Sequence, residues 1–274
     1  MTVEPPGWYP DPWHPAGVRY WDGAGWTSNA AAPAPAAPTA HPTLPLQVAL
    51  GALAAMALPL LVSRLLLRSL AGLHWPIAVY VVLAGLIGYG PPMLFCRYAS
   101  RRWGSGRLRA DIGLQVRRVD AGWGPLTWLA AFAAEALVAV LITALHVPFQ
   151  NNTDQISAAR EHPGYVIPML VLAVIAAPVV EEIVFRGMIL RGFLSRMGPV
   201  AAIGLQGVLF GLAHFDPSRG AGNVGLLLVL ATVGCVFGGA AYLTRRLGPT
   251  MIAHAILNGI AMIVVLSGWT PGAK

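Results

Sequence analysis

Charged side chains are scarce in this chain. Only 11% of its 274 residues are Asp, Glu, Lys or Arg, whereas 56% are hydrophobic, and the mean hydropathy is +0.64. Soluble globular proteins are about a quarter charged, so this composition excludes an ordinary soluble domain. Several apolar runs approach or exceed the roughly 20 residues that cross a bilayer as a helix. The sequence predicts an all-α, polytopic transmembrane helical bundle.

Cysteine is scarce as well. Cys96 and Cys235 are far apart and lie in apolar surroundings, which excludes a disulfide framework and a CxxC metal site. The first 45 residues are polar and rich in Pro and Trp, so they lack the apolar core of a cleavable signal peptide. We therefore expect the first membrane helix to act as the insertion signal.

Acidic residues are outnumbered, and the net charge is +7. In a soluble protein this excess would suggest a nucleic-acid partner. Here the basic residues gather in short loops between apolar runs, as the positive-inside rule predicts for a membrane protein. We expect the partners to be the lipid bilayer and a membrane-associated peptide or protein, and no nucleic acid.

The chain divides into three zones. Residues 1–29 contain four Trp among Pro and Gly turn signals, which indicates a small Trp-rich module of short strands; a disordered aromatic tail is the alternative. Its "PGWYPDPWHPAGVRYWDGAGWT" stretch resembles a Trp-rich domain of unknown function found at the N-termini of many bacterial membrane proteins. Residues 30–45 alternate Ala with Pro, which favours an extended spacer. Residues 46–274 form the membrane domain.

The membrane domain contains about seven predicted spans. The loop over residues 96–124 holds seven Arg. If it is cytoplasmic, the inner segments hold 12 basic residues and the outer segments 5, so we expect a multi-pass protein of the cell membrane with a cytoplasmic N-terminus. The predicted spans are 46–67, 76–96, 125–147, 166–190, 199–215, 223–244 and 249–268.

Three charges interrupt the fourth span in "APVVEEIVFRGMIL" (residues 177–190). A charged side chain at the centre of a membrane helix costs roughly 2.5–3.5 kcal/mol on insertion scales, so a compensating role is expected. Glu182 and Arg186 are four residues apart and share a helix face, where they can neutralise each other. Glu181 points elsewhere and lacks such a partner, which leaves it available for proton transfer. A purely structural ion pair is the alternative.

Two further polar pairs lie on apolar helices. Phe210 and His214 in "LFGLAHF", and His254 and Asn258 in "MIAHAILNGI", are each four residues apart. Either pair alone would be read as a contact between helices. Together with the glutamates they provide a base, two imidazoles and an amide donor. Such a set can activate water and stabilise an oxyanion on a peptide carbonyl.

The motifs "EEIVFRG", "FGLAHF" and "HAILNG" resemble EExxxR, FxxxH and HxxxN of the CPBP family, the CAAX proteases and bacteriocin-processing proteins also called Abi or Rce1-like. The resemblance covers residues 110–268 and implies an intramembrane (metallo)endopeptidase. It implies water activation by Glu181 and His214. It also implies oxyanion stabilisation or metal binding by His254 and Asn258, and support from Glu182, Arg186 and Phe210.

A divalent metal such as zinc is compatible with the same residues. Glu181, His214 and His254 could provide three ligands and leave a fourth position open, as catalytic zinc requires. The chain has no HExxH motif, and the residues also work without metal. The sequence is compatible with both alternatives.

Other functions and residues are weaker predictions. A catalytically idle scaffold or immunity protein would retain the fold, and a proton-coupled transporter would use an intramembrane acid as a relay. Glu135, in the third span, could line the site, whereas His146 is expected at the membrane interface. Regular spans also predict a mismatch: Glu181 and His254 fall in the inner half of the membrane, and His214 falls near the outer end of its helix.

Overall fold

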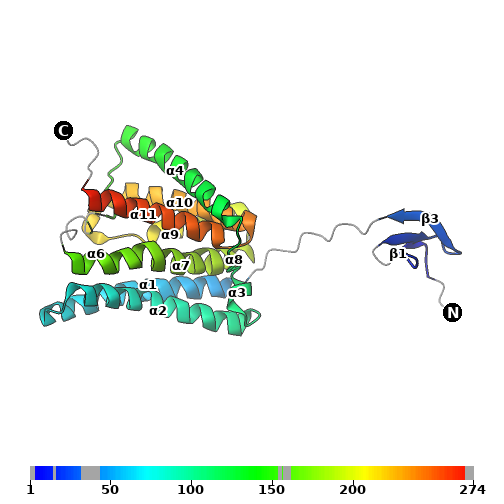
Figure 1. Cartoon of the computed structure of the whole chain (residues 1–274), viewed down its shortest axis with the longest axis horizontal. Coiled ribbons are helices and arrows are strands. Elements are labelled where there is room, and N and C mark those ends of the chain that lie inside the picture. The colour runs from blue at the N-terminus through cyan, green and yellow to red at the C-terminus, as the bar shows by residue number, and fades with distance from the viewer. Residues whose placement is uncertain (1–3, 15–16, 32–43, 154–155, 157–161, 269–274) are drawn as a thin grey trace. The chain divides into compact units, whose positions relative to one another are not determined.

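The computed structural model describes residues 4–14, 17–31, 44–153, 156 and 162–268. The chain separates into two compact units, Met1–His41 and Pro42–Lys274 (Figure 1). Most of the predicted Ala/Pro spacer (residues 30–45) lies outside the described residues. The last strand of the first unit runs to Ala31, two residues beyond the predicted end of the module.

The N-terminal unit is a three-stranded antiparallel sheet of order β1-β2-β3. Its strands are β1 (Gly7–Pro10), β2 (Val18–Trp21) and β3 (Trp26–Ala31). In the turn between β2 and β3, the Asp22 carboxylate accepts hydrogen bonds from the backbone N–H groups of Ala24 and Gly25. The rings of Trp21 and Trp26 pack edge to face with centroids 5.4 Å apart. The sheet confirms the predicted Trp-rich β module.

The membrane domain is entirely helical among the residues described. Five helices are long and apolar enough to cross a bilayer, and α9 and the start of α1 are shorter apolar segments, so the predicted count of seven spans is approximate. The all-α bundle itself is confirmed. The principal helices are α1 (Leu46–Leu70), α2 (Ile77–Trp103), α4 (Asp120–Ala144), α6 (Pro163–Leu170), α7 (Ala177–Glu182), α8 (Leu190–Leu194), α9 (Pro199–Leu212), α10 (Asn223–Thr244) and α11 (Gly248–Ser267).

The fourth span is one continuous helix with two wide turns. The π-helical segments η2 (Val171–Ala176) and η3 (Ile183–Ile189) flank α7, so α6 to α8 run without a break. Figure 1 shows this helix between the α1–α2 pair and the group α9, α10 and α11. The C-terminal end of α4 diverges from α11. Val184, Phe185 and Met188 are fully buried here. The charged motif therefore lies on a stretch, residues 181–193, in which every residue is buried.

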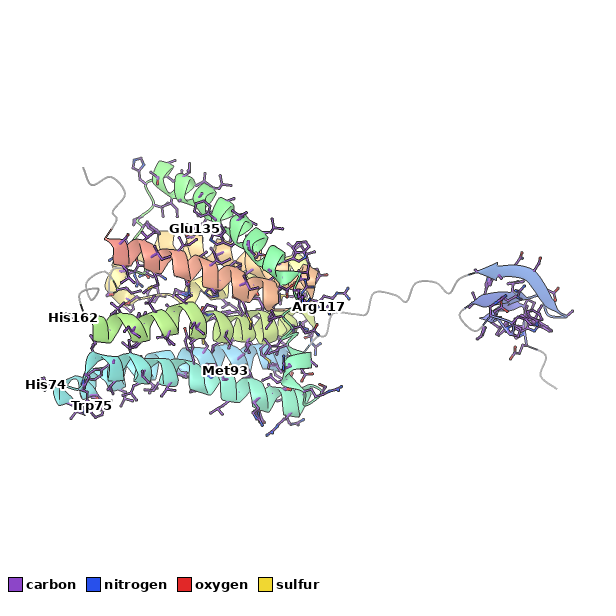
Figure 2. All side chains as sticks on the ribbon, in the orientation of Figure 1. His74, Trp75, Met93, Arg117, Glu135 and His162 are labelled. Atoms are coloured by element: carbon purple, nitrogen blue, oxygen red, sulfur yellow. The ribbon has the colours of Figure 1, made fainter. Side chains whose placement is uncertain are left out.

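Most described arginines lie at one end of the bundle. Arg117 is at the end opposite His74, Trp75 and His162 (Figure 2). The Arg246 guanidinium pairs with the Asp120 carboxylate at 2.7 Å, which joins the start of α4 to the loop before α11. The predicted loop over residues 96–124 is partly helical, because α2 extends to Trp103, the short helix α3 spans Leu108–Asp111, and α4 begins at Asp120.

The short α9 bears on the predicted difference in depth between His214 and the other site residues. It has 14 residues, whereas the antiparallel α10 has 22, which correspond to lengths of about 21 Å and 33 Å. His214 follows the end of α9 at Leu212. It lies beside the same cavity as Glu181 and His254.

Candidate active site

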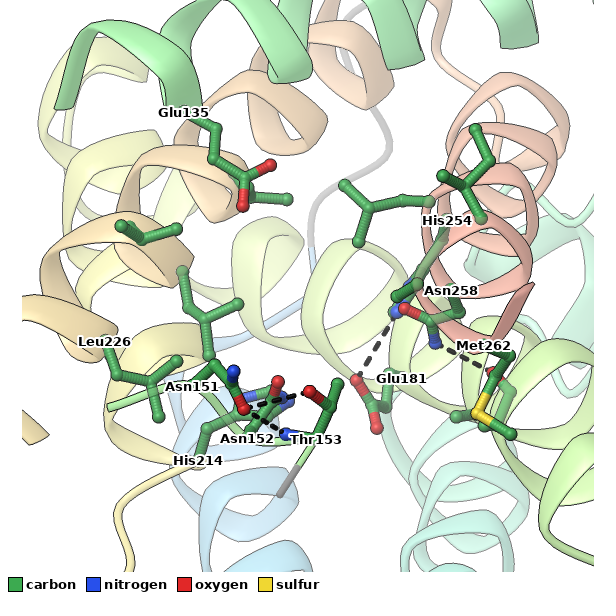
Figure 3. Close-up of a pocket in the computed structure, with 18 of the residues that line it drawn as sticks. Glu135, Asn151, Asn152, Thr153, Glu181, His214, Leu226, His254, Asn258 and Met262 are labelled. Carbon is green, nitrogen blue, oxygen red and sulfur yellow. Dashed lines mark hydrogen bonds and ion pairs between the residues drawn. The ribbon is translucent and has the colours of Figure 1, made fainter. Parts of the chain in front are cut away.

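A cavity of about 520 Å³ lies inside the membrane domain, within the usual range for ligand sites. Figure 3 shows Glu181, His214, His254 and Asn258 around it. Two α-helices, α7 and α11, and the segment after α9 supply these residues, which are about 80 positions apart at most. Phe210 and Glu135 also line the cavity, whereas Glu182 and Arg186 do not. The structure therefore separates the predicted residues into a lining set and a pair behind it.

The pair behind the cavity is an ion pair without solvent contact. Arg186 Nη1 lies 2.8 Å from Glu182 Oε1, and neither side chain is exposed. Arg186 also donates to the Gly234 carbonyl oxygen at 3.2 Å. A buried ion pair needs such additional hydrogen bonds to offset its desolvation. This is the i,i+4 contact expected from the sequence.

The ring of Phe210 separates this pair from the cavity. The Arg186 guanidinium carbon lies 4.4 Å from the Phe210 ring centroid, a distance at which a desolvated cation is attracted to an aromatic face. The Phe210 ring also contacts both histidines: the ring centroids are 6.0 Å apart for His254 and 5.1 Å apart for His214. Phe210 thus packs against the cation and both imidazoles.

His254 connects the two glutamates. Its Nδ1 lies 2.9 Å from Glu182 Oε1. An ionised Glu182, paired with Arg186, can only accept, so Nδ1 carries the proton. In neutral His254 the other nitrogen, Nε2, is then an acceptor. It lies 3.9 Å from Glu181 Oε2, too far for a direct hydrogen bond.

Glu181 has a second partner that the sequence reasoning missed. The hydroxyl of Tyr89, on α2, donates to Glu181 Oε1 at 2.8 Å. Tyr89 lies in "LIGYGPPM", and a tyrosine in the middle of an apolar helix is the one signal that pointed to it, since a buried hydroxyl requires a partner. Glu181 Oε2 is buried and has no hydrogen-bond partner among the described residues.

His214 is held by the last turn of the preceding helix, α9. Its Nδ1 lies 2.9 Å from the Phe210 carbonyl oxygen. A carbonyl can only accept, so Nδ1 donates and Nε2 of the neutral ring carries the lone pair. Within the described residues, the ion-pair contact to Glu181 comes from His254 and not from His214. The expected pairing of Glu181 with His214 is therefore not a direct contact.

Asn258 is anchored by a hydrogen bond to the π-helical turn in the fourth span. Its Nδ2 donates to the Ala173 carbonyl oxygen at 2.7 Å. In the π-turn the Ala177 N–H bonds to Leu172, and the next residue, Pro178, has no N–H to give to Ala173. Asn258 supplies the missing donor. Its second amide N–H and its Oδ1 are not needed for that bond.

The rim of the cavity includes two loops. Asn151, Asn152 and Thr153 line it from the segment after α4. The Arg219 Nε group, from the loop after α9, donates to the Asn151 carbonyl oxygen at 3.2 Å. These rim residues carried no motif and were not predicted.

The three expected metal ligands are not gathered into one cluster. Within the described residues, no group of three or more His, Cys, Asp and Glu side chains is arranged to hold a metal ion. The two histidines each present an Nε2 acceptor, but only His254 approaches Glu181. The arrangement does not fit a three-ligand centre, and metal binding stays a prediction.

Comparison with known protein families covers both units. Residues 163–260, which contain all three motifs, match the family described as type II CAAX prenyl endopeptidase Rce1-like. Over these residues the membrane domain is similar to the Rce1-like family. This confirms the family predicted from the motifs, over a shorter segment than residues 110–268. Tyr89 and Glu135 lie outside the Rce1-like segment. Residues 6–39 match a family of unknown function, DUF2510, as expected for the Trp-rich module. No curated protein and no solved structure matches the chain.

Proposed function

We propose that the protein is an intramembrane endopeptidase that hydrolyses a peptide bond of a membrane-associated peptide or protein. At the family level, the Rce1-like match supports CAAX-type protease activity. The observation that carries the proposal is the pair Glu181 Oε2 and His254 Nε2, 3.9 Å apart on the wall of one cavity.

The separation of these two atoms suits a bridging water. A water about 2.8 Å from each atom completes the triangle. Because a carboxylate oxygen and a deprotonated Nε2 both accept, the water donates both protons and turns its lone pairs toward the cavity. This orientation makes the water a nucleophile, and Glu181 is the base that takes its proton.

The remaining polar residues act on the carbonyl and on the leaving group. As the water oxygen bonds to the peptide carbon, negative charge develops on the carbonyl oxygen. The second N–H of Asn258 donates to that oxyanion. When the C–N bond breaks, the leaving nitrogen takes the proton from Glu181, and His214 Nε2 relays a proton between the cavity and the rim. Glu182 and Arg186 orient His254 without touching the substrate.

Proteolysis is tested with the purified full-length chain in liposomes and a library of fluorogenic peptides. We expect cleavage that is lost in Glu181→Gln. Cleavage that persists unchanged in that variant would reject Glu181 as the base. If the wild-type protein cleaves no peptide, the endopeptidase proposal fails.

A further inference from the structure

One wall of the cavity carries a second carboxylate that the proposed reaction does not use. Glu135 is half-buried on α4 and lines the cavity. Figure 3 shows its carboxylate pointing into the cavity from the side opposite Glu181. Within the described part of the chain, the Glu135 carboxylate makes no hydrogen bond and no ion pair. An acidic side chain in a membrane helix without a partner calls for a ligand of complementary charge.

Aromatic rings adjoin this carboxylate. Trp128 and Phe132 lie seven and three residues before Glu135, on the same face of α4, and both line the cavity. Their rings stack, with centroids 5.9 Å apart. Aromatic faces attract ammonium and guanidinium groups. The α4 wall therefore combines the two features that bind an organic cation, a carboxylate and π-faces.

The charge of the cavity favours the same ligand. The described lining residues include two carboxylates, Glu135 and Glu181, and no Lys or Arg. The nearest interior cation, Arg186, is paired with Glu182. A negatively charged group in the cavity would meet these two like charges, and Arg219, at the rim, is paired with Asp216. A cation on an apolar stem would meet both the carboxylate and the apolar wall.

We propose that Glu135, Trp128 and Phe132 form a subsite for a cationic side chain, Lys or Arg, of the peptide substrate. The aliphatic stem lies along the two rings, and the charged group contacts Glu135. The inference rests on the proposed peptidase function in naming a peptide as the ligand. The cation subsite itself does not depend on cleavage. Glu135 acts here as a specificity residue, away from the reacting atoms.

Peptide cleavage provides the first test. The full-length protein in liposomes is given fluorogenic peptides that differ only by Lys, Met or Glu at one position near the cut. We expect kcat/KM to be at least about tenfold higher for Lys than for Met, and lowest for Glu. Glu135→Gln should remove the preference for Lys while the Met peptide is still cut, and Glu135→Lys should reverse it toward Glu. Glu4→Gln, an exposed carboxylate in the N-terminal unit, is the matched control and should leave the ratio unchanged.

Binding without cleavage provides the second test. Hexylammonium and hexanol share a stem and differ in charge, and a ligand that binds the folded state raises the melting temperature. Hexylammonium should stabilise the wild-type protein and Glu4→Gln more than hexanol does, and Glu135→Gln should respond equally to both. An equal response in the wild type, or a difference retained in Glu135→Gln, overturns the subsite. Discrimination between the ligands without any peptide cleavage would uphold the subsite and reject the peptidase. Cleavage of the Lys and Met peptides at equal rates would uphold the peptidase and reject the subsite.

Discussion

The hydroxyl of Tyr89 on α2 donates a 2.8 Å hydrogen bond to Oε1 of Glu181 on α7. The bond occupies one carboxylate oxygen and leaves the other, Oε2, facing His254 Nε2 at 3.9 Å. Tyr89 thus fixes which oxygen of the proposed base meets the water. It acts through Glu181 as a positioning residue.

Tyr89→Phe should lower kcat by about tenfold to a hundredfold, because a hydrogen bond to a charged group is worth about 1.5–3 kcal/mol. KM should change little, since the hydroxyl does not contact the substrate. The matched control is Tyr80→Phe on the same helix, where the hydroxyl bonds to the Leu70 carbonyl oxygen away from the cavity. A similar loss of turnover in both variants would reduce Tyr89 to a structural role.

The two adjacent glutamates should respond differently to substitution. Glu181→Ala should abolish turnover and retain the fold, because it removes the base and leaves the buried Glu182–Arg186 pair intact. Glu182→Ala should destabilise the protein by about 3–5 kcal/mol, because it leaves Arg186 buried without its counter-ion. Thermal unfolding in detergent together with cleavage rates distinguishes the variants. Equal stability and equal residual activity would contradict this division.

Asn258 combines two roles that a second substitution can separate. Asn258→Ala should lower kcat by about 10²- to 10³-fold with little change in KM, as for the loss of one oxyanion donor. It should also lower stability, because the Ala173 carbonyl loses the hydrogen bond from the Asn258 amide.

Adding Pro178→Ala restores a backbone N–H beside that carbonyl. The double variant should therefore recover stability and not activity. Recovery of both by the double variant would show that Asn258 serves only to satisfy the helix.

Whether activity requires a bound metal can be tested directly. The described residues gather no three-ligand cluster, and the mechanism above uses side chains alone, so activity should survive dialysis against a chelator. If metal analysis finds a bound ion that disappears in His254→Ala and remains in Asn258→Ala, the ligand set of Glu181, His214 and His254 gains support. Loss of wild-type activity in chelator, restored by zinc, would replace the metal-free mechanism.

The distribution of arginine predicts the orientation in the membrane. The loop residue Ser105 lies at the Arg-rich end, which we expect to be cytoplasmic. His146 follows α4 at the other end and is exposed. After replacement of Cys96 and Cys235 by Ala, Ser105→Cys should resist an impermeant thiol reagent added to intact cells, and His146→Cys should react. The opposite labelling pattern would invert the topology.

Local patterns in the sequence were enough for the helical bundle and for the Glu182–Arg186 pair. Apolar runs of about 20 residues have few alternatives to a membrane helix, and an i,i+4 contact depends only on helix geometry. The Trp-rich β module was predictable for a similar reason, because turn residues and aromatic alternation act over a few positions. The three motifs indicated the family by their order and spacing.

Only the tertiary structure decided which of these residues meet. Tyr89 reaches Glu181 across 92 positions and His254 reaches Glu182 across 72, so these contacts depend on how whole helices pack. The expected pairing of Glu181 with His214 gave way to Glu181 with His254, because rotation and tilt of α11 bring its histidine to the carboxylate. Helix packing and the end of α9 at Leu212 brought His214 to the cavity, and the π-turn before Pro178 created the acceptor that holds Asn258. Helix ends, helix rotation and wide turns are set by the packing of many side chains together, which a local pattern does not encode.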